Sequence, residues 1–147
     1  MTPRPDPLPH QVLMRRALDL ARRARAHGNH PFGALLADPS GKVRLEAENT
    51  VVPEGDCTGH AETNLMRLAC LNLDRDVLAA ATLYSSTEPC AMCAGAIYWA
   101  GVSQVVFGLR GPSRGQGCGG GADHRDTVEE GVHRRPEQCR RGPAGRI

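Results

Sequence analysis

The sequence predicts an α/β fold in which helices pack against a sheet. Helix-type and strand-type hydrophobic patterns alternate along residues 9–109 in the order α-β-β-α-β-α-β. Turn-forming residues separate several of these patterns. We expect the last strand, helix and strand to form a parallel unit with a right-handed crossover. A length of 147 residues makes one domain the default.

The first expected element is a helix from Pro9 to about Ala26. Arginines occupy one face, so that face should meet solvent while the opposite face packs on the sheet. The stretch His27-Gly28-Asn29 is typical of a helix end. The apolar face is expected to consist of Val12, Leu13, Ala17, Leu20, Ala21 and Ala24.

Next comes a β-hairpin. Strands are expected at residues 32–37 and 42–49, joined by the turn Asp38-Pro39-Ser40-Gly41. A loop from Val51 to Gly59 follows.

A second long helix is expected from His60 to about Asn72. Its inward face should carry Leu65, Leu68, Ala69 and Leu71, and Cys70 should be an inert core residue on the same helix.

The remaining elements are a strand at 82–86, a helix at 90–100 and a strand at 104–108. Between residues 91 and 100 every face of the helix is apolar, so the pattern does not indicate which side is buried.

The C-terminal segment 110–147 has a different composition. It is rich in glycine and arginine and has no aromatic residue. Such a segment cannot bury enough apolar area to offset the entropy of ordering it. We therefore expect a domain at residues 9–109 and a poorly ordered or divergent tail at 110–147.

Overall composition argues against several partners. The net charge is only +2, which by itself indicates neither a nucleic-acid nor a membrane partner. No apolar run approaches the ~20 residues that span a bilayer. The N-terminal stretch is interrupted by charge and lacks the apolar core of a signal peptide. The expected location is the cytoplasm, where close cysteine pairs favour metal or redox chemistry over structural disulfides.

Two separated stretches carry the candidate chemistry. Cys90 and Cys93 form a Cys-x-x-Cys pair behind Pro89, a spacing that lets both sulfurs face one zinc ion. Taken alone, the pair could also be a redox motif or two packed cysteines. Upstream, His60 and Glu62 flank one small residue at the predicted start of a helix.

Together these residues predict a catalytic zinc site. His60, Cys90 and Cys93 supply three ligands, and the fourth position is left for water. Glu62 can reach that water and act as the proton-transferring base. The combination H-x-E…P-C-x-x-C is the signature of zinc deaminases. Cys57 is a weaker candidate ligand, because its binding would close the site.

Further residues resemble one superfamily. The stretches TGHAETNLMRLA and TLYSSTEPCAMCAGAIYWAGVSQVVFG, with PFGALLAD and Asn49, are similar to the cytidine deaminase-like superfamily, and most of all to guanine deaminases and related small nucleobase and nucleoside deaminases. The resemblance implies a three-layer α/β/α sandwich, with a central mixed sheet and helices on both faces. It also implies a homodimer or larger oligomer.

The resemblance also implies substrate contacts. Phe32 would stack on the base, Asn49 would bond its polar edge, the Ala61 backbone N–H would hold a ring carbonyl, and Trp99 would line the pocket. From the residues alone, Phe32 could instead be core beneath the first helix, Asn49 could cap the following loop, and Trp99 could pack in the core or at an interface. Guanine deaminases also use an acidic residue and an aromatic near the C-terminus, where this chain offers Asp123 and Asp126 but no aromatic.

The leading functional hypothesis is hydrolytic deamination of a nucleobase or nucleoside, with an aminopurine such as guanine or guanosine favoured. Cytosine or cytidine is the nearest alternative. A tRNA wobble-adenosine deaminase is a further alternative and needs a basic surface, which the arginines of the first helix and of the C-terminal tail could provide. A zinc-stabilised binding protein without catalysis is the alternative from another class.

Overall fold

The computed structural model describes residues 10–110 and the backbone of residues 131–134. Segments 1–9, 111–130 and 135–147 are outside the described part. Most of the tail at 110–147, which was predicted to be poorly ordered or divergent, lies outside the described residues, and so do Asp123 and Asp126.

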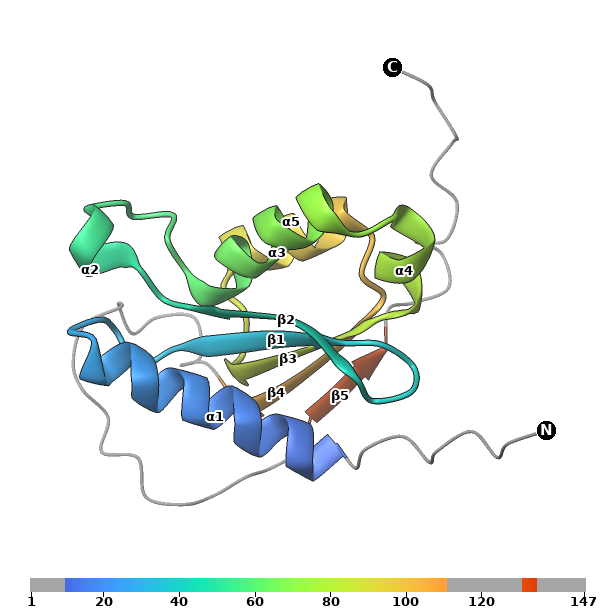
Figure 1. The fold of residues 1–147 in the computed structure, drawn as a ribbon, viewed down its shortest axis with the longest axis horizontal. Helices are drawn as coiled ribbons and strands as arrows, with labels where there is room; N and C mark the ends of the chain where they lie inside the picture. The colour runs from blue at the N-terminus through green and yellow to red at the C-terminus, as the bar shows by residue number, and fades with distance from the viewer. Residues whose placement is uncertain (1–9, 111–130, 135–147) are drawn as a thin grey trace.

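The centre of the fold is a mixed five-stranded sheet in the order β2-β1-β3-β4-β5 (Figure 1). Among the strand pairs of the described residues, β3–β4 alone is parallel, as the sequence predicts for the strands on either side of the last long helix. The last strand, which pairs with β4, was not predicted. The bounds are β1 Gly33–Ala37, β2 Val43–Glu48, β3 Thr82–Thr87, β4 Gln104–Leu109 and β5 Gly131–Arg134.

Helices cover both faces of the sheet. Figure 1 shows α1 (His10–Ala26) on one face, with α3 (Ala61–Asn72) and α5 (Ala91–Ala100) on the other. The three-layer α/β/α prediction is thus confirmed. Two short helices were not predicted: α2 (Val51–Glu54) lies within the predicted loop, and α4 (Arg75–Ala80) lies in a stretch with no predicted element. Within the described ranges no helix is both long and apolar enough to cross a bilayer.

Helix α1 packs on the sheet through the predicted stripe, with one exchange. Val12 is 48% exposed, and Met14 is buried in its place. The stripe therefore lies slightly further round the helix than the sequence suggested. The backbones of α1 and β1 approach closely at Gly33, where an added Cβ would lie 2.4 Å from the Leu20 Cβ. Only glycine fits there without moving the helix.

The other face of the sheet forms a second core with α3 and α5. Strand β1 contributes to both cores, because Ala34 and Leu36 face α3 and α5 while Leu35 faces α1. This burial on both faces explains why β1 reads as a continuous apolar run.

Three inward predictions for α3 were wrong. Leu68 is 39% exposed, Leu71 is 77% exposed and Cys70 is also exposed. The buried stripe instead follows Ala61, Glu62, Leu65, Met66 and Ala69, which share one helical face.

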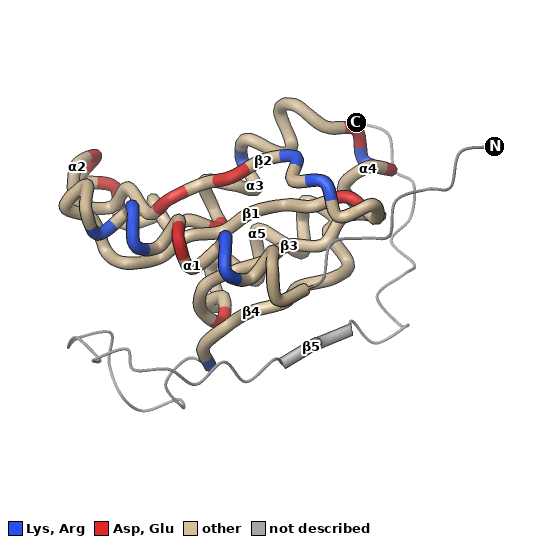
Figure 2. The backbone as a smooth tube through the Cα atoms, turned by 60° about the horizontal axis from the view of Figure 1, so that its bottom comes forward, with Lys and Arg blue, Asp and Glu red and all other residues tan. Residues whose placement is uncertain are grey.

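Ion pairs join α1 to the edge strand β2. Figure 2 shows basic positions along α1 and acidic positions along β2. Arg16 pairs with Glu46, Arg23 Nε donates to a Glu48 oxygen at 2.7 Å, and His27 Nδ1 donates to the other Glu48 oxygen at 2.8 Å. Partial burial of Glu48 opposes ionisation, but the bonds from Arg23 and His27 outweigh it and lower the pKa of Glu48.

The first prediction concerns this edge. A carboxylate whose pKa is lowered by folding stabilises the fold above its ordinary pKa, and this contribution is lost as pH falls through the folded value. We expect Glu48→Gln to lower the free energy of unfolding at pH 7 by about 1 kcal/mol or less, because the partner cations are exposed. The difference from the parent should vanish in acid, as measured by denaturant unfolding against pH.

The control for this prediction is Glu54→Gln. Glu54 is exposed and accepts one hydrogen bond from Thr50, which a glutamine oxygen can also accept. A Glu48→Gln deficit that persists unchanged in acid would contradict the role of the Glu48 charge.

Candidate active site

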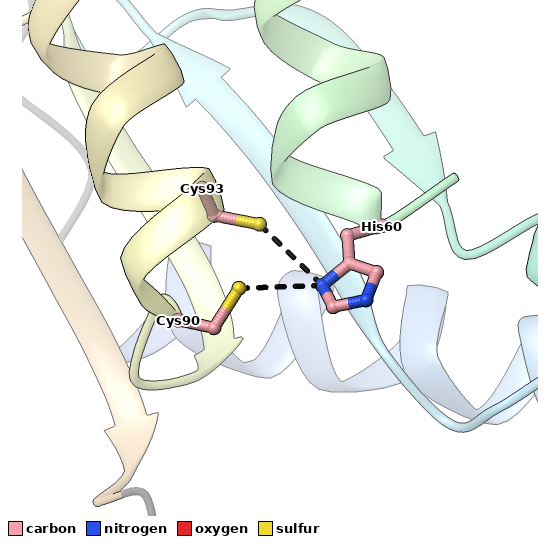
Figure 3. Close-up of side chains that lie close together, drawn as sticks. All are labelled: His60, Cys90 and Cys93. Carbon is pink, nitrogen blue, oxygen red and sulfur yellow. Dashed lines mark hydrogen bonds between the residues drawn. The ribbon is translucent and has the colours of Figure 1, made fainter. Parts of the chain in front are cut away.

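Two helices begin at the site. His60 is the N-cap residue of α3 and Cys90 is the N-cap residue of α5; both have extended backbones. Neither side chain caps its own helix, so both are available to a ligand. Cys93 follows within the first turn of α5. Figure 3 shows the two sulfurs pointing toward the same edge of the His60 ring.

The geometry of these three side chains fits zinc. The ligand atoms of His60, Cys90 and Cys93 all lie within 4.8 Å of one another. His60 Nδ1 is 3.5 Å from Cys90 Sγ and 3.6 Å from Cys93 Sγ. A tetrahedral zinc ion, with bonds of about 2.3 Å to sulfur and about 2.0–2.1 Å to nitrogen, places such atoms about 3.6 Å apart. The donor set is therefore spaced for this metal, with Nδ1 as the histidine ligand.

Burial is graded across the metal group. Cys93 is buried, His60 is intermediate and Cys90 is exposed, so solvent reaches the group from the Cys90 side. Among the described residues the group has no fourth histidine, cysteine or acidic ligand. Cys57, the weaker candidate, is exposed and lies outside it.

Cys93 has the most unusual environment in the group. Burial raises the pKa of its thiol, and the nearby Glu62 carboxylate raises that pKa further. Thr63 Oγ1 lies 3.4 Å from the sulfur and can stabilise it by hydrogen bonding. Because zinc binds the thiolate, metal binding has to release the proton from Cys93.

Glu62 lies beside the metal group and is buried. It occupies the first turn of α3, where the helix N-terminus favours a negative charge. Its Oε2 accepts a hydrogen bond from Cys93 Sγ at 3.5 Å, and its Oε1 accepts one from Ser85 Oγ at 2.7 Å. The carboxylate therefore lies close enough to the ligand atoms to contact a water molecule bound there.

A single amide joins the end of β2 to the start of α3. Asn64 Nδ2 donates to the Glu48 carbonyl and to Thr50 Oγ1, both at 3.0 Å. The Thr50 N–H donates to the Gly59 carbonyl at 2.8 Å. A Cβ at Gly59 would lie 2.8 Å from Thr50 Oγ1, so glycine is needed for this close contact. These bonds hold the residue before His60 against the residue after Asn49.

Two of the predicted substrate residues lie side by side. The Asn49 N–H donates to the Phe32 carbonyl at 3.1 Å. Asn49 is 1% exposed, and its Oδ1 accepts from the Val51 N–H at 3.1 Å, which is the loop-capping role considered above. Phe32 packs against the core formed by α3 and α5, so its alternative placement beneath α1 was wrong. Ala61 is fully buried at the first position of α3.

Trp99 does not join this group. It lies near the C-terminal end of α5, is 82% exposed and packs edge-on against Tyr98. The core-packing alternative for Trp99 was therefore wrong. Its placement in a pocket or at an interface stays a prediction.

Three polar residues near the site were missed from the sequence. Thr63, Asn64 and Ser85 contact Cys93, the loop before His60, and Glu62 respectively. Ser85 carried a weak signal, because its hydroxyl lies two residues after Leu83 and therefore on the same face of the strand. The others sit in a helix whose polar positions look like ordinary solvent-facing ones.

Comparisons with known proteins give the site its context. The chain matches the model described as the cytidine and deoxycytidylate deaminase zinc-binding region over residues 8–109. A probable cytosine deaminase of Schizosaccharomyces pombe is 46% identical over 96 residues, covering 65% of this chain and 57% of that protein. A tRNA-specific adenosine deaminase of Haemophilus influenzae is 41% identical over 98 residues, covering 67% and 57%. The chain thus spans less than two thirds of the length of these relatives.

Structural similarity leads to the same group of enzymes. The solved guanine deaminase of Bacillus subtilis has a TM-score of 0.64 and 37% identity, covering 70% of this chain and 66% of that one. The family match extends over more than half of the chain, and the structure gathers a histidine and two cysteines at zinc spacing. The chain belongs to the family of the cytidine and deoxycytidylate deaminase zinc-binding region.

Proposed function

We propose that this protein is a zinc-dependent hydrolytic deaminase of a nucleobase or nucleoside. One observation carries the proposal: a buried carboxylate, Glu62, lies directly beside a group of three zinc-type ligands. A purely structural zinc site has four protein ligands and needs no such base. Relatives named as cytosine, adenosine and guanine deaminases support the same reaction class.

His60, Cys90 and Cys93 would hold the metal. When bound, zinc supplies the Lewis acidity that makes water a nucleophile near neutral pH. Glu62 Oε2, on the side of the metal group, takes one proton from the attacking water and passes it to the ring nitrogen beside the amino-bearing carbon. Glu62 then takes the remaining proton from the added hydroxyl group and delivers it to the departing amine. The net change replaces C–NH₂ with C=O and releases ammonia.

Substrate recognition would come from residues at the ends of β1, β2 and α3: Phe32, Asn49 and Ala61. Asn49 Oδ1 already accepts the Val51 N–H, so its Nδ2 is the group that would donate to a carbonyl on the base. The Ala61 N–H is at the first position of a helix, where backbone N–H groups have no intrahelical acceptor. Phe32, joined to Asn49 by a backbone bond, would provide the stacking surface.

Within this class we favour an aminopurine such as guanine or guanosine. The solved structure of a guanine deaminase covers 70% of this chain and supports that choice. Cytosine or cytidine is the second candidate, supported by the 46% identity to a probable cytosine deaminase. Both substrates present an amidine carbon to the same metal and base.

A tRNA substrate has less support from the surface. Arg16 and Arg23 on α1 pair with acidic residues of β2. Moreover, α1 covers the face of the sheet opposite to α3 and α5, whose first residues form the site (Figure 1). The basic residues of α1 therefore lie on the other side of the sheet from the metal group.

We also propose that the protein forms a homodimer through the outer sides of α3 and α5. Large apolar side chains are rarely left exposed together unless they contact a partner. Five such residues occur on these two helices: Leu68 and Leu71 on α3, and Met92, Tyr98 and Trp99 on α5. Trp99, at 82% exposed, is the strongest candidate anchor.

The reaction is tested with a panel of free bases and nucleosides. The zinc-loaded protein should release ammonia from guanine or guanosine, with cytosine and cytidine as the competing pair. Inosine formation in tRNA, with salt-sensitive tRNA binding, would favour the adenosine deaminase alternative. If none of the compounds releases ammonia, the alternative of a zinc-stabilised binding protein without catalysis would be favoured.

A matched pair of variants separates the base from the metal. Glu62→Gln should keep zinc and lose about 10²–10⁴-fold in kcat, because glutamine cannot carry the proton. His60→Ala should lose zinc, because two sulfurs alone leave the site incomplete. Metal analysis and ammonia release measure the two effects. Near-parental kcat in Glu62→Gln, or stoichiometric zinc in His60→Ala, would contradict the assigned roles.

The dimer is tested by Trp99→Lys. Placing a charge in the centre of an apolar interface should shift the protein to monomer, as measured by sedimentation velocity at micromolar concentration. Val12→Lys is the matched control, because Val12 is also an exposed apolar residue but lies on α1, across the sheet. A parent that is monomeric throughout the concentration range would rule out the interface.

A further inference from the structure

We propose that Ser85 is the positioning residue that aims the Glu62 carboxylate at the metal group; this rests on the proposed function. Ser85 and Glu62 are joined by one short contact. Ser85 Oγ donates to Glu62 Oε1 at 2.7 Å, and both side chains are buried, at 1% and 6% exposed. A hydrogen bond to a buried carboxylate is stronger than one between neutral groups.

Ser85 is out of place as a core residue. On β3, Leu83 and Ser85 are two residues apart and therefore point to the same face of the sheet. Leu83 belongs to the apolar core that packs against α3 and α5. A hydroxyl on that face costs free energy unless it is hydrogen-bonded, and Glu62 provides the acceptor.

The bond decides which way the carboxylate faces. The end group of a glutamate side chain rotates broadly about its last torsion. With Oε1 held by Ser85, Oε2 is the oxygen that faces Cys93 and the metal group. In the zinc-loaded protein the Cys93 sulfur serves as a metal ligand, so its bond to Oε2 is not available. Among the hydrogen bonds found for Glu62 in the described residues, the bond from Ser85 is then the one that remains to fix the carboxylate.

Proton transfer depends strongly on such fixed geometry. A displacement of about 1 Å at a reacting group can reduce the rate by roughly 100-fold. Ser85 does not touch the substrate or the metal in this scheme. Its role is to reduce the number of orientations that Glu62 samples, which affects turnover more than binding.

The test compares three variants of the zinc-loaded full chain. Ser85→Ala should lower kcat roughly 10- to 100-fold, with KM and zinc content near parental values. Ser85→Thr, which keeps the hydroxyl, should restore most of kcat. Ser86→Ala is the matched control, because Ser86 is equally buried but accepts the Gly33 N–H at 3.1 Å. It should lose stability without the kcat loss.

The second readout does not depend on activity. Crystal structures of the zinc-loaded parent and Ser85→Ala should show Glu62 in one orientation in the parent, and rotated or in several conformers in the variant. The inference is overturned if Ser85→Ala keeps parental kcat, if its kcat falls only in step with zinc content or equally in Ser86→Ala, or if Glu62 keeps its orientation. If the parent deaminates no compound, the proposed function fails while the crystal structures still decide the role of Ser85.

Discussion

The metal group depends on one constraint: two helices must begin at the same end of the sheet. His60 and Cys90 occupy the N-cap positions of α3 and α5, and Cys93 lies within the first turn of α5. These two helices pack side by side on the same core (Figure 1). The N-termini of both helices, which carry the positive ends of the helix dipoles, meet at the site. A shift of either helix along the sheet would separate the sulfurs from the imidazole.

The surrounding structure holds those helix starts in place. On one side, Asn64 joins the end of β2 to the loop before His60. On the other side, β3 leads directly into the loop that carries Cys90. Leu83 of β3 packs in the same core as Ile97 and Ala100 of α5, which fixes the distance of α5 from the sheet. The face opposite the site is closed by α1, whose ion pairs with β2 are separate from the chemistry. This division lets one face of the sheet provide stability and the other provide the site.

Polar groups inside the second core follow the same logic. Glu62 and Ser85 are buried where α3 packs on the sheet, which is unfavourable for polar groups without a partner. They satisfy each other, and Glu62 also faces the metal ligands. A core built for stability alone would place apolar residues at both positions. Their presence is most simply understood through the reaction rather than the fold.

By itself, the sequence predicted the fold class, the order of most elements and the three zinc-type ligands that the structure brings together, with Glu62 beside them. It could do so because hydrophobic periodicity and the H-x-E and C-x-x-C spacings are local properties of the chain. The tertiary structure decided what depends on distant segments meeting. It showed that Ser85 reaches Glu62 and that Asn64 joins the end of β2 to the residue before His60. It also showed that Leu68, Leu71 and Trp99 face outward. An all-apolar helix such as α5 has no pattern that names its buried side, so only its packing against the sheet could assign it.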